Sequence, residues 1–528
     1  MRKTKKSKSI ILLSCLLILC ITGMGTGVHA QESRTIAYDA HGIPHIAGEI
    51  IVQFHSEETP MSMVTLGFED EQYQSPYMDA YLLEALHVLG YIVKSDLSHI
   101  VPGMQLASID QTVPVEAAVE MLERSQYVAY AEPNYLITLD PVEQAMVDAQ
   151  SSASLAAQRL QIPNDPLYSS QWGLTKIQAD KVWGVTTGRQ DTIIAVIDTG
   201  IDYNHPDLAA NIWREHYYSW NFVSNNADPM DDNGHGTHIA GIIGAVGNNG
   251  IGIAGVNWNV KIMPLKIIGA DGNGDIISAV SAIHYAQQVG ADIISSSFGI
   301  KANSQALADV IRQTNVLFVV AAGNEGANND VTPYYPSNLG YNNMIVVTAT
   351  DTSDQLASLS NHGQKTVNVA APGVDIVSTS PANGYAYMSG TSMATSFVSG
   401  IAGLMLSVNP GLSPAQLKSL IIQSVDGTPS LYSKISSDGR VNAEKAVNAA
   451  RGGSTTQAPT LTKTPTKTPT FIPGPITPFP TITIWPTPTT TFIPGPITPL
   501  PTITIWPTPT TTFTPGPIDP MPGPIDFD

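Results

Sequence analysis

Short apolar runs alternate with helical segments over residues 162–452 of the 528-residue chain. The runs are four to seven residues long and suit strands that are buried on both faces of a sheet. Helical segments such as 276–289 and 304–314 separate several of them. The pattern predicts an α/β fold with a doubly wound, mostly parallel sheet, in which functional residues gather at the carboxyl ends of strands. The predicted strands are 192–197, 261–267, 292–296, 316–321, 344–347 and 366–370.

Residues 1–30 have the composition of a signal peptide. Five basic residues precede an apolar run over 10–21, and small residues then lead to Ala30. A transmembrane anchor is disfavoured because the run is shorter than the roughly 20 residues that span a bilayer. A lipoprotein site at Cys20 is a further alternative, which the bulky Leu19 before it disfavours. We expect a secreted, extracellular protein with no transmembrane span after signal removal.

Charge and cysteine usage narrow the classes of partner and the sources of stability. The net charge is −19, and removal of the basic signal segment makes it more negative. Such a chain is repelled by phosphate backbones, so we expect no nucleic-acid partner. Both cysteines, Cys15 and Cys20, lie in the signal segment. The exported protein must therefore be stabilised by its core or by bound ions rather than by disulfides.

A small α+β domain is predicted at residues 31–142. Strand patterns at 49–54, 103–109 and 127–136 alternate with helical patterns at 78–89 and 115–124. From residue 137 to 161 the chain is rich in Ala, Ser and Gln, which is typical of a linker. We assign the linker proper to residues 143–161.

The tail at residues 453–528 is rich in Pro and Thr and nearly free of charge. A seven-residue sequence at 470–476 recurs at 491–497. Proline at this density prevents both helix and sheet ladders, so the tail is predicted to be a disordered, extended spacer. Trp485 and Trp506 are unusual in a spacer and leave open an alternative, docking to a cell wall or polysaccharide.

Three separated segments carry candidate catalytic residues. Asp198 ends a predicted buried strand, where a turn-forming role is the alternative. His235 lies among small residues just before a predicted helix, and a metal pair with His238 is its alternative. That pair lacks the acidic base of the usual zinc-protease helix. Ser392 precedes a helical run at 396–407, where it either caps the helix or directs the helix dipole at an oxyanion.

Together these three segments resemble the signature blocks of the subtilisin-like serine proteases, and the surrounding sequence is most similar to the thermitase branch. The resemblance extends over nearly all of residues 162–452, with the triad in the order Asp, His, Ser. It implies that Ser392 is the nucleophile, His235 the general base and Asp198 the residue that orients the imidazole.

Two further blocks resemble the substrate-handling segments of this family. The run 320–326 matches the oxyanion block and makes Asn324 the side-chain donor, although a turn Asn after a strand is the alternative. The run 295–299 matches the substrate-binding strand. The resemblance therefore implies protein or peptide substrates that bind as an added strand and are cleaved in extended segments. The implied substrate-binding residues are Ser297, Phe298 and Gly299.

The loop 246–253 resembles the family's strong calcium loop, whereas an Asn-Gly turn is the ordinary alternative. The resemblance implies a structural Ca²⁺ held by oxygen ligands from side chains and backbone carbonyls. The implied ligand residues are Asp165, Asp207, Val246, Asn249, Ile251 and Ile253.

The small domain ends in 130–135, a stretch that resembles the propeptides of this family. The resemblance implies that residues 31–142 template folding and then inhibit the enzyme, with self-cleavage between 143 and 162. A catalytically silent relative is disfavoured because no site residue is missing. An esterase is disfavoured because the sequence around Ser392 is not a G-x-S-x-G elbow. The sequence thus predicts a secreted, self-processing serine endopeptidase.

Overall fold

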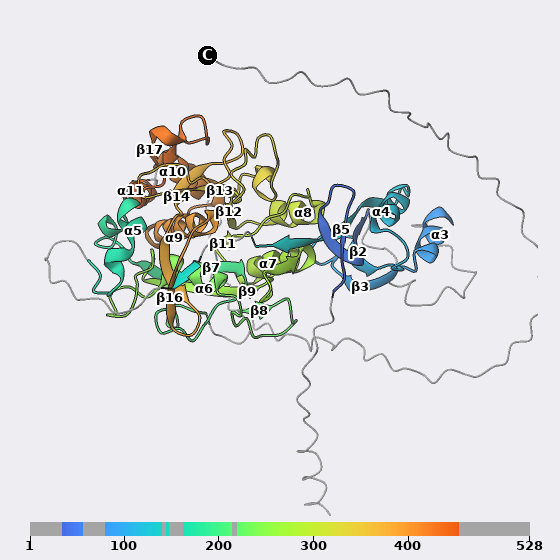
Figure 1. The fold of residues 1–528 in the computed structure, drawn as a ribbon, viewed down its shortest axis with the longest axis horizontal. Coiled ribbons are helices and arrows are strands. Elements are labelled where there is room, and N and C mark those ends of the chain that lie inside the picture. The colour runs from blue at the N-terminus through green and yellow to red at the C-terminus, as the bar shows by residue number, and fades with distance from the viewer. Residues whose placement is uncertain (1–33, 56–79, 140–143, 147–161, 214–218, 453–528) are drawn as a thin grey trace, which may run out of the picture. The chain divides into compact units, whose positions relative to one another are not determined.

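The structure is a computed structural model that describes residues 34–55, 80–139, 144–146, 162–213 and 219–452. The predicted signal peptide, the tail and most of the linker lie outside these residues. Two sheets dominate the described part (Figure 1). One belongs to the N-terminal domain at residues 34–139 and the other to the domain at residues 162–452. We call them the pro-domain and the catalytic domain after the roles that the sequence predicts for them.

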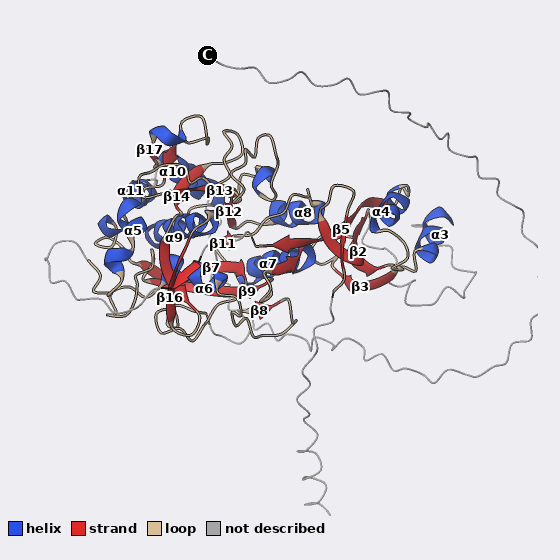
Figure 2. Cartoon of the chain, viewed as in Figure 1, coloured by secondary structure: helices blue, strands red, loops and turns tan. Residues whose placement is uncertain are grey.

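The pro-domain has a ferredoxin-like βαββαβ order preceded by a short strand. Its sheet has the strand order β5-β2-β4-β3, and every pairing in it is antiparallel. The helices α3 and α4 lie on the face of this sheet that points away from the catalytic domain (Figure 2). The elements are β1 Ile36–Tyr38, β2 Pro44–Phe54, α3 Ala80–Val88, β3 Ile92–Asp96, β4 Met104–Ser108, α4 Val115–Glu123 and β5 Val128–Thr138.

The catalytic domain is built on a nine-stranded sheet with the order β17-β18-β14-β13-β12-β11-β7-β9-β8. All its pairings are parallel except that of β17 with β18. Its strands are β7 Gly188–Asp198, β8 Trp220–Asn221, β9 Asn259–Lys266, β11 Ile293–Ser296, β12 Leu317–Ala321, β13 Met344–Thr350, β14 Val369–Pro372, β17 Asp426–Gly427 and β18 Gly439–Arg440. The predicted fold class is confirmed.

Helices cover both faces of this sheet, so alternate residues of each strand enter different cores. In β7, Ile194 and Val196 pack with α6 and α9, whereas Ala195 and Ile197 pack with α7 and α8. The helices are α5 Trp172–Lys176, α6 His235–Gly244, α7 Ile276–Val289, α8 Gln305–Gln313, α9 Thr391–Val408, α10 Pro414–Gln423 and α11 Ala443–Gly452. Burial on both faces explains why the strands lack polar alternation.

The chain reverses its direction of winding at β7, which has β9 on one side and β11 on the other. Such a switch point opens a crevice at the carboxyl ends of the strands. One short sheet and one strand added to the pro-domain's sheet complete the architecture near this end. A hairpin of β15 Ile376–Ser380 and β16 Gly384–Met388 precedes α9, and β10 Asn273–Asp275 pairs antiparallel with β5 of the pro-domain.

Three boundaries differ from the sequence prediction. The helix α9 begins at Thr391 rather than at 396, so Ser392 lies inside its first turn. The strand predicted at 366–370 begins only at Val369, because Asp330 binds the backbone and hydroxyl of Thr366 in a turn. The stretch from 137 to 161 is not wholly a linker. β5 continues to Thr138, and β6 Gln144–Met146 pairs with β16.

Among the described residues, α9 is the one helix long and apolar enough to cross a membrane. Its 18-residue span has a mean hydropathy of 1.4, but 89% of that span is buried inside the protein. Packing between α6, α11 and the central strands accounts for this composition. The helix is therefore a core element of the catalytic domain.

Candidate active site

Asp198 is the last residue of the central strand β7, and its carboxylate is almost fully buried. Its Oδ1 accepts hydrogen bonds from the Thr199 amide and from Nδ1 of His235, both at 2.8 Å. The structure therefore brings together the acid and the imidazole that the sequence predicted. A carboxylate bound to Nδ1 fixes the ring orientation and favours the tautomer with its proton on Nδ1.

His235 is the first residue of α6, and glycines on either side fix where that helix starts. Gly234 has φ 111°, a left-handed conformation that favours glycine. A Cβ atom at Gly236 would collide with the carbonyl oxygen of Gly200 and lie 3.2 Å from Asp198. The helix can thus approach the end of β7 closely enough for the imidazole to reach Asp198.

Asp231 organises the same helix start and was missed by the sequence analysis. Its Oδ1 accepts from the Gly234 amide at 2.9 Å and the Thr199 hydroxyl at 2.8 Å. Its Oδ2 accepts from the amide and hydroxyl of Thr237. Burial raises the pKa of this carboxyl, and these donors oppose that rise. The signal was an acid three residues before a glycine that opens a helix, a position from which a carboxylate can cap the first turn.

His238 lies one turn after His235 but faces a different environment. Its Nε2 lies 3.0 Å from the carbonyl oxygens of Ile376 and Ala386, so it donates to the β15–β16 hairpin. Complete burial lowers the pKa of His238 to about 3, which keeps the ring neutral. No cluster of three or more His, Cys, Asp or Glu side chains suited to a metal occurs among the described residues. The alternative role of His238, as a metal ligand paired with His235, is disfavoured because its Nε2 is bound to two backbone carbonyl oxygens.

Ser392 is the second residue of α9 and lies buried at its N-terminal end. Its Oγ lies 3.5 Å from the Ser297 carbonyl oxygen, which directs the hydroxyl toward the predicted substrate strand. The N-cap of α9 is Gly390, so the interpretation of Ser392 as a side-chain cap is wrong. Since α6 packs directly against α9, the starts of the two helices lie on the same side of the sheet.

Asn324 follows the carboxyl end of β12 and is tied to the start of α9. Its Oδ1 accepts from the Thr391 amide at 2.8 Å and from the Thr391 hydroxyl at 2.9 Å. These bonds set the orientation of the amide, with Nδ2 on the opposite side of the side-chain carbon from Oδ1. The predicted donor is thereby held beside the residue that precedes Ser392.

Two backbone segments flank the end of β5 close to Ser392, and we call the space between them the cleft. Ser297, Phe298 and Gly299 follow β11 and form one wall, and β10 forms the other. The end of β5 lies between them, with Thr138 paired with Gly299 and the Leu139 amide 2.9 Å from the Gly272 carbonyl oxygen. The sequence analysis missed β10, because its residues Asn273–Asp275 have no strand pattern of their own. The pro-domain thus binds in the cleft as an added strand.

The six predicted calcium ligands lie together around the loop 246–253. Asp165 accepts from the Asn249 amide at 3.1 Å, and Asp207 accepts from Nδ2 of Asn249 at 2.8 Å. The Ile253 amide donates to Asp207 at 2.9 Å, and the Val246 amide donates to the Asp207 carbonyl. The Ile251 amide donates to the side chain of Asn249.

The two carboxylates at this loop suit a divalent cation. Burial raises the pKa of Asp165, and it raises the pKa of Asp207 to about 6, with the charge of Asp165 adding to the shift. Within the described residues, neither carboxylate forms an ion pair with Lys or Arg. Two buried carboxylates without a cationic side-chain partner in the described residues supply the hard oxygen ligands that Ca²⁺ prefers.

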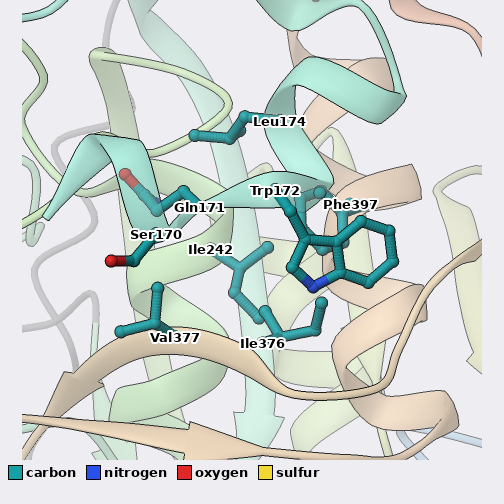
Figure 3. A pocket seen from close by; sticks show the side chains of 9 residues that line it. Ser170, Gln171, Trp172, Leu174, Ile242, Ile376, Val377 and Phe397 are labelled. Carbon is teal, nitrogen blue, oxygen red and sulfur yellow. The ribbon is translucent and has the colours of Figure 1, made fainter. Parts of the chain in front are cut away.

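A small cavity beside α5 serves packing rather than binding. Figure 3 shows Trp172 and Phe397 next to Ile242 and Ile376. The cavity measures about 10 Å³, the lower limit for one water molecule. Because its lining comes from α5, α6, β15 and α9, this apolar contact helps to fix the two helices that carry His235 and Ser392.

The fold and the site define a hydrolase of the subtilase type, with a histidine–aspartate pair at a switch point of a parallel sheet. The Subtilase family model matches residues 189–454, and the chain belongs to this family. It is a serine endopeptidase, as its relatives are.

Three relatives illustrate the similarity. A thermophilic serine proteinase of Bacillus sp. (strain AK1) is 39% identical over 63% of this chain and 76% of the relative. Thermitase of Thermoactinomyces vulgaris is 41% identical over 54% of this chain and 99% of the relative. A cell wall-associated protease of Bacillus subtilis is 37% identical over 49% of this chain and 31% of the relative. The predicted likeness to the thermitase branch is confirmed.

Proposed function

We propose that Asp198, His235 and Ser392 form the catalytic triad, and that Asn324 and the Ser392 amide form the oxyanion hole. The single observation that carries this proposal is the 2.8 Å contact between Nδ1 of His235 and Oδ1 of Asp198, beside the buried start of α9. The contact supplies a base whose tautomer is fixed, and the helix start supplies a nucleophile next to backbone donors.

In this mechanism Ser392 Oγ attacks the scissile carbonyl while Nε2 of His235 takes the hydroxyl proton. The resulting oxyanion accepts hydrogen bonds from Nδ2 of Asn324 and the Ser392 amide, and the dipole of α9 favours its charge. His235 then gives the proton to the leaving amine, and Asp198 stabilises the imidazolium. Water, activated by the same imidazole, hydrolyses the acyl-enzyme and restores Ser392.

The substrates are protein or peptide segments in an extended conformation. A substrate takes the place of the end of β5 and pairs with β10 and with Ser297, Phe298 and Gly299. Backbone hydrogen bonds give affinity that tolerates many sequences. Folded elements cannot enter, because their backbone groups are already paired.

The pro-domain is an intramolecular inhibitor and folding template, and the protein is a zymogen. Support comes from the strand that it places in the cleft and from its contacts with two helix starts. Glu132 accepts hydrogen bonds at the start of α8, from the Ser304 hydroxyl and the Gln305 amide, both at 2.7 Å. Asn134 accepts from the Ile277 amide at the start of α7. Self-cleavage in the linker at 143–161 then frees the catalytic domain.

One structural Ca²⁺ binds at the loop 246–253. Asp165, Asp207 and Asn249 contribute side-chain oxygens, and Val246, Ile251 and Ile253 contribute carbonyls. The ion neutralises the two buried carboxylates and stabilises the native loop, and it takes no part in the chemical steps.

The signal peptide at residues 1–30 directs the protein out of the cell. Absence of cysteine from the rest of the chain is compatible with this destination, because the fold then needs no disulfide formation. The tail at 453–528 is either a spacer that holds the catalytic domain away from a surface or a segment that docks to a cell wall or polysaccharide.

Expression of the wild type beside Ser392→Ala and Ser407→Ala tests the proposal. Ser407 lies at the far end of the same helix, so it is a matched control. We expect the wild type and Ser407→Ala to shed the pro-domain and cleave casein. Ser392→Ala should persist as the full-length protein, with activity reduced by at least about 10⁴-fold. Self-processing of Ser392→Ala at the wild-type rate would contradict the proposed mechanism.

A further inference from the structure

Asp275 is a buried carboxylate at the rim of the substrate cleft that the catalytic mechanism does not use. It is the last residue of β10 and the N-cap of α7, and its side chain is 2% exposed. Its Oδ1 accepts from the Ser278 amide at 2.9 Å, which caps the helix. Its Oδ2 is bound by the guanidinium of Arg34. One oxygen therefore has a structural role, whereas the other binds a cation.

The cation comes from the part of the protein that is removed on maturation. Arg34 precedes β1 of the pro-domain, and its side chain is 48% exposed. Within the described residues, Arg34 is the one hydrogen-bond partner of Asp275 Oδ2. Removal of the pro-domain takes this cation away, and a cationic side chain of a bound substrate would restore the ion pair.

A bound substrate can supply that cation. Asp275 pairs in register with Leu136 of β5, the strand that a substrate would replace. Register partners in an antiparallel ladder place their side chains on the same face, with Cβ atoms about 4.5–5.5 Å apart. A long basic side chain in the place of Leu136 can therefore reach Asp275.

The space around Asp275 is large enough for such a side chain. A cavity of about 300 Å³ is lined by Leu136, Asp271, Asp275 and Arg34, together with apolar side chains such as Ile267. Arg34 is the one cation among these lining residues, and both acids belong to the catalytic domain. The catalytic domain contributes the acids Asp271 and Asp275 and the apolar Val223 and Ile267 to this lining, a combination that suits the head and stem of Arg or Lys.

We propose that Asp275 is a specificity-determining residue that selects substrates with a basic side chain in the register position of Leu136. This inference rests on the proposed function and names a substrate class for it: extended segments with Arg or Lys two residues before the residue that pairs with Gly299. In the zymogen, Arg34 fills the same subsite from outside the bound strand.

The test uses mature enzyme obtained from the full-length chain. Peptide substrates carry Leu at all positions four to seven residues before the scissile bond, or a single Arg at one of them. We expect Arg to raise kcat/KM by about threefold to fivefold only at the position that takes the place of Leu136. This factor is the range of an exposed to partly buried ion pair. High salt should reduce this preference, and Glu at the same position should lower kcat/KM below that of the all-Leu peptide.

Asp275→Asn should abolish the preference, because Asn retains the helix cap but has no charge. Asp191→Asn is the control, since it removes one carboxylate at the opposite end of β7 and should leave the preference unchanged. No Arg preference in the wild type, or one that persists in Asp275→Asn, would overturn the inference while cleavage of the all-Leu peptide upholds the proposed function. Failure of the wild type to cleave any peptide would overturn both. The Glu substitution tests the subsite in the wild type even if Asp275→Asn folds poorly.

Discussion

The catalytic domain and the pro-domain both contain a sheet covered by helices, but only the catalytic domain covers both faces with its own chain. Its strands enter one core with α6 and α9 and another with α7 and α8. The pro-domain fills one face with α3 and α4, whereas side chains from the other face, such as Ile51 and Met104, join the core at α7 and α8. A domain that borrows half of its core can be removed after folding, and the domain that lends the core remains intact.

The chemistry follows the same division. In the catalytic domain, charged groups are aimed inward at the ends of strands, as Asp198 is toward His235. In the pro-domain, the buried carboxylate Glu132 and the amide of Asn134 point outward at the starts of α8 and α7. The first arrangement serves a reaction, and the second serves an interface between domains. Three predictions test this difference.

The largest expected effect is on turnover, and it comes from Asn324→Ala. Removal of one oxyanion donor costs about 10²–10³ in kcat, because the oxyanion exists only after the attack, and KM should change little. Asn315→Ala is a matched control, since Asn315 is exposed and precedes the opposite end of β12. Steady-state kinetics of the mature variants on one peptide measures both constants. A proportionate rise in KM with unchanged kcat would assign Asn324 to ground-state binding instead.

Structural elements that follow from local sequence patterns could be predicted from the sequence. Buried strands and capped helices are local patterns, and 276–289 coincides with α7. The triad segments could be identified because each one follows a strand or opens a helix. The family and the fold class are confirmed, whereas the roles of the individual site residues stay predictions.

Features that depend on contacts between distant segments could not be predicted. Asn273–Asp275 becomes a strand only because β5 pairs with it, and its own residues are those of a turn. The helix α9 begins earlier than predicted because Thr391 is held by Asn324, which lies 67 positions away. Asp231 acts through groups that come together only when β7 meets α6. Such contacts leave no periodic pattern in the sequence.

The second prediction concerns the proposed stabilisation of the catalytic domain by calcium. Chelation should lower the thermal midpoint of the mature wild-type enzyme, which is kept inhibited to prevent self-digestion. A ligand that binds only the native state adds about 2.7 kcal/mol to the free energy of unfolding when its concentration is 100 times its Kd. Asp207→Asn should start from a lower midpoint and respond little to the chelator. Calorimetry with and without Ca²⁺ measures both effects. An unchanged midpoint after verified removal of bound metal would contradict the calcium proposal.

The smallest expected effect lies at the interface, where Glu132 should make the pro-domain contact sensitive to pH. Burial raises the pKa of Glu132 to about 7 from the ordinary 4.5, although donors at the start of α8 oppose the rise. The nearby carboxylate of Asp309 raises it further, and Arg312 pairs with Asp309. The pKa of Glu132 is therefore higher in the folded protein than in the unfolded chain. The contribution of Glu132 to the free energy of unfolding is fully present below pH 4.5 and is lost as the pH rises to 7.

A comparison of Ser392→Ala with Ser392→Ala/Glu132→Gln in the full-length chain isolates this group. Glutamine does not titrate, so the difference between the two thermal midpoints should grow from pH 4.5 to 7 and then stay level, by on the order of 2 kcal/mol in unfolding free energy. Glu120→Gln, an exposed change on α4 of the same domain, should give a difference that does not vary with pH. A difference for Glu132→Gln that does not vary with pH would mean that the donors at the start of α8 keep the carboxylate ionised throughout this range. The interface would then hold a permanently charged carboxylate, as the catalytic domain does.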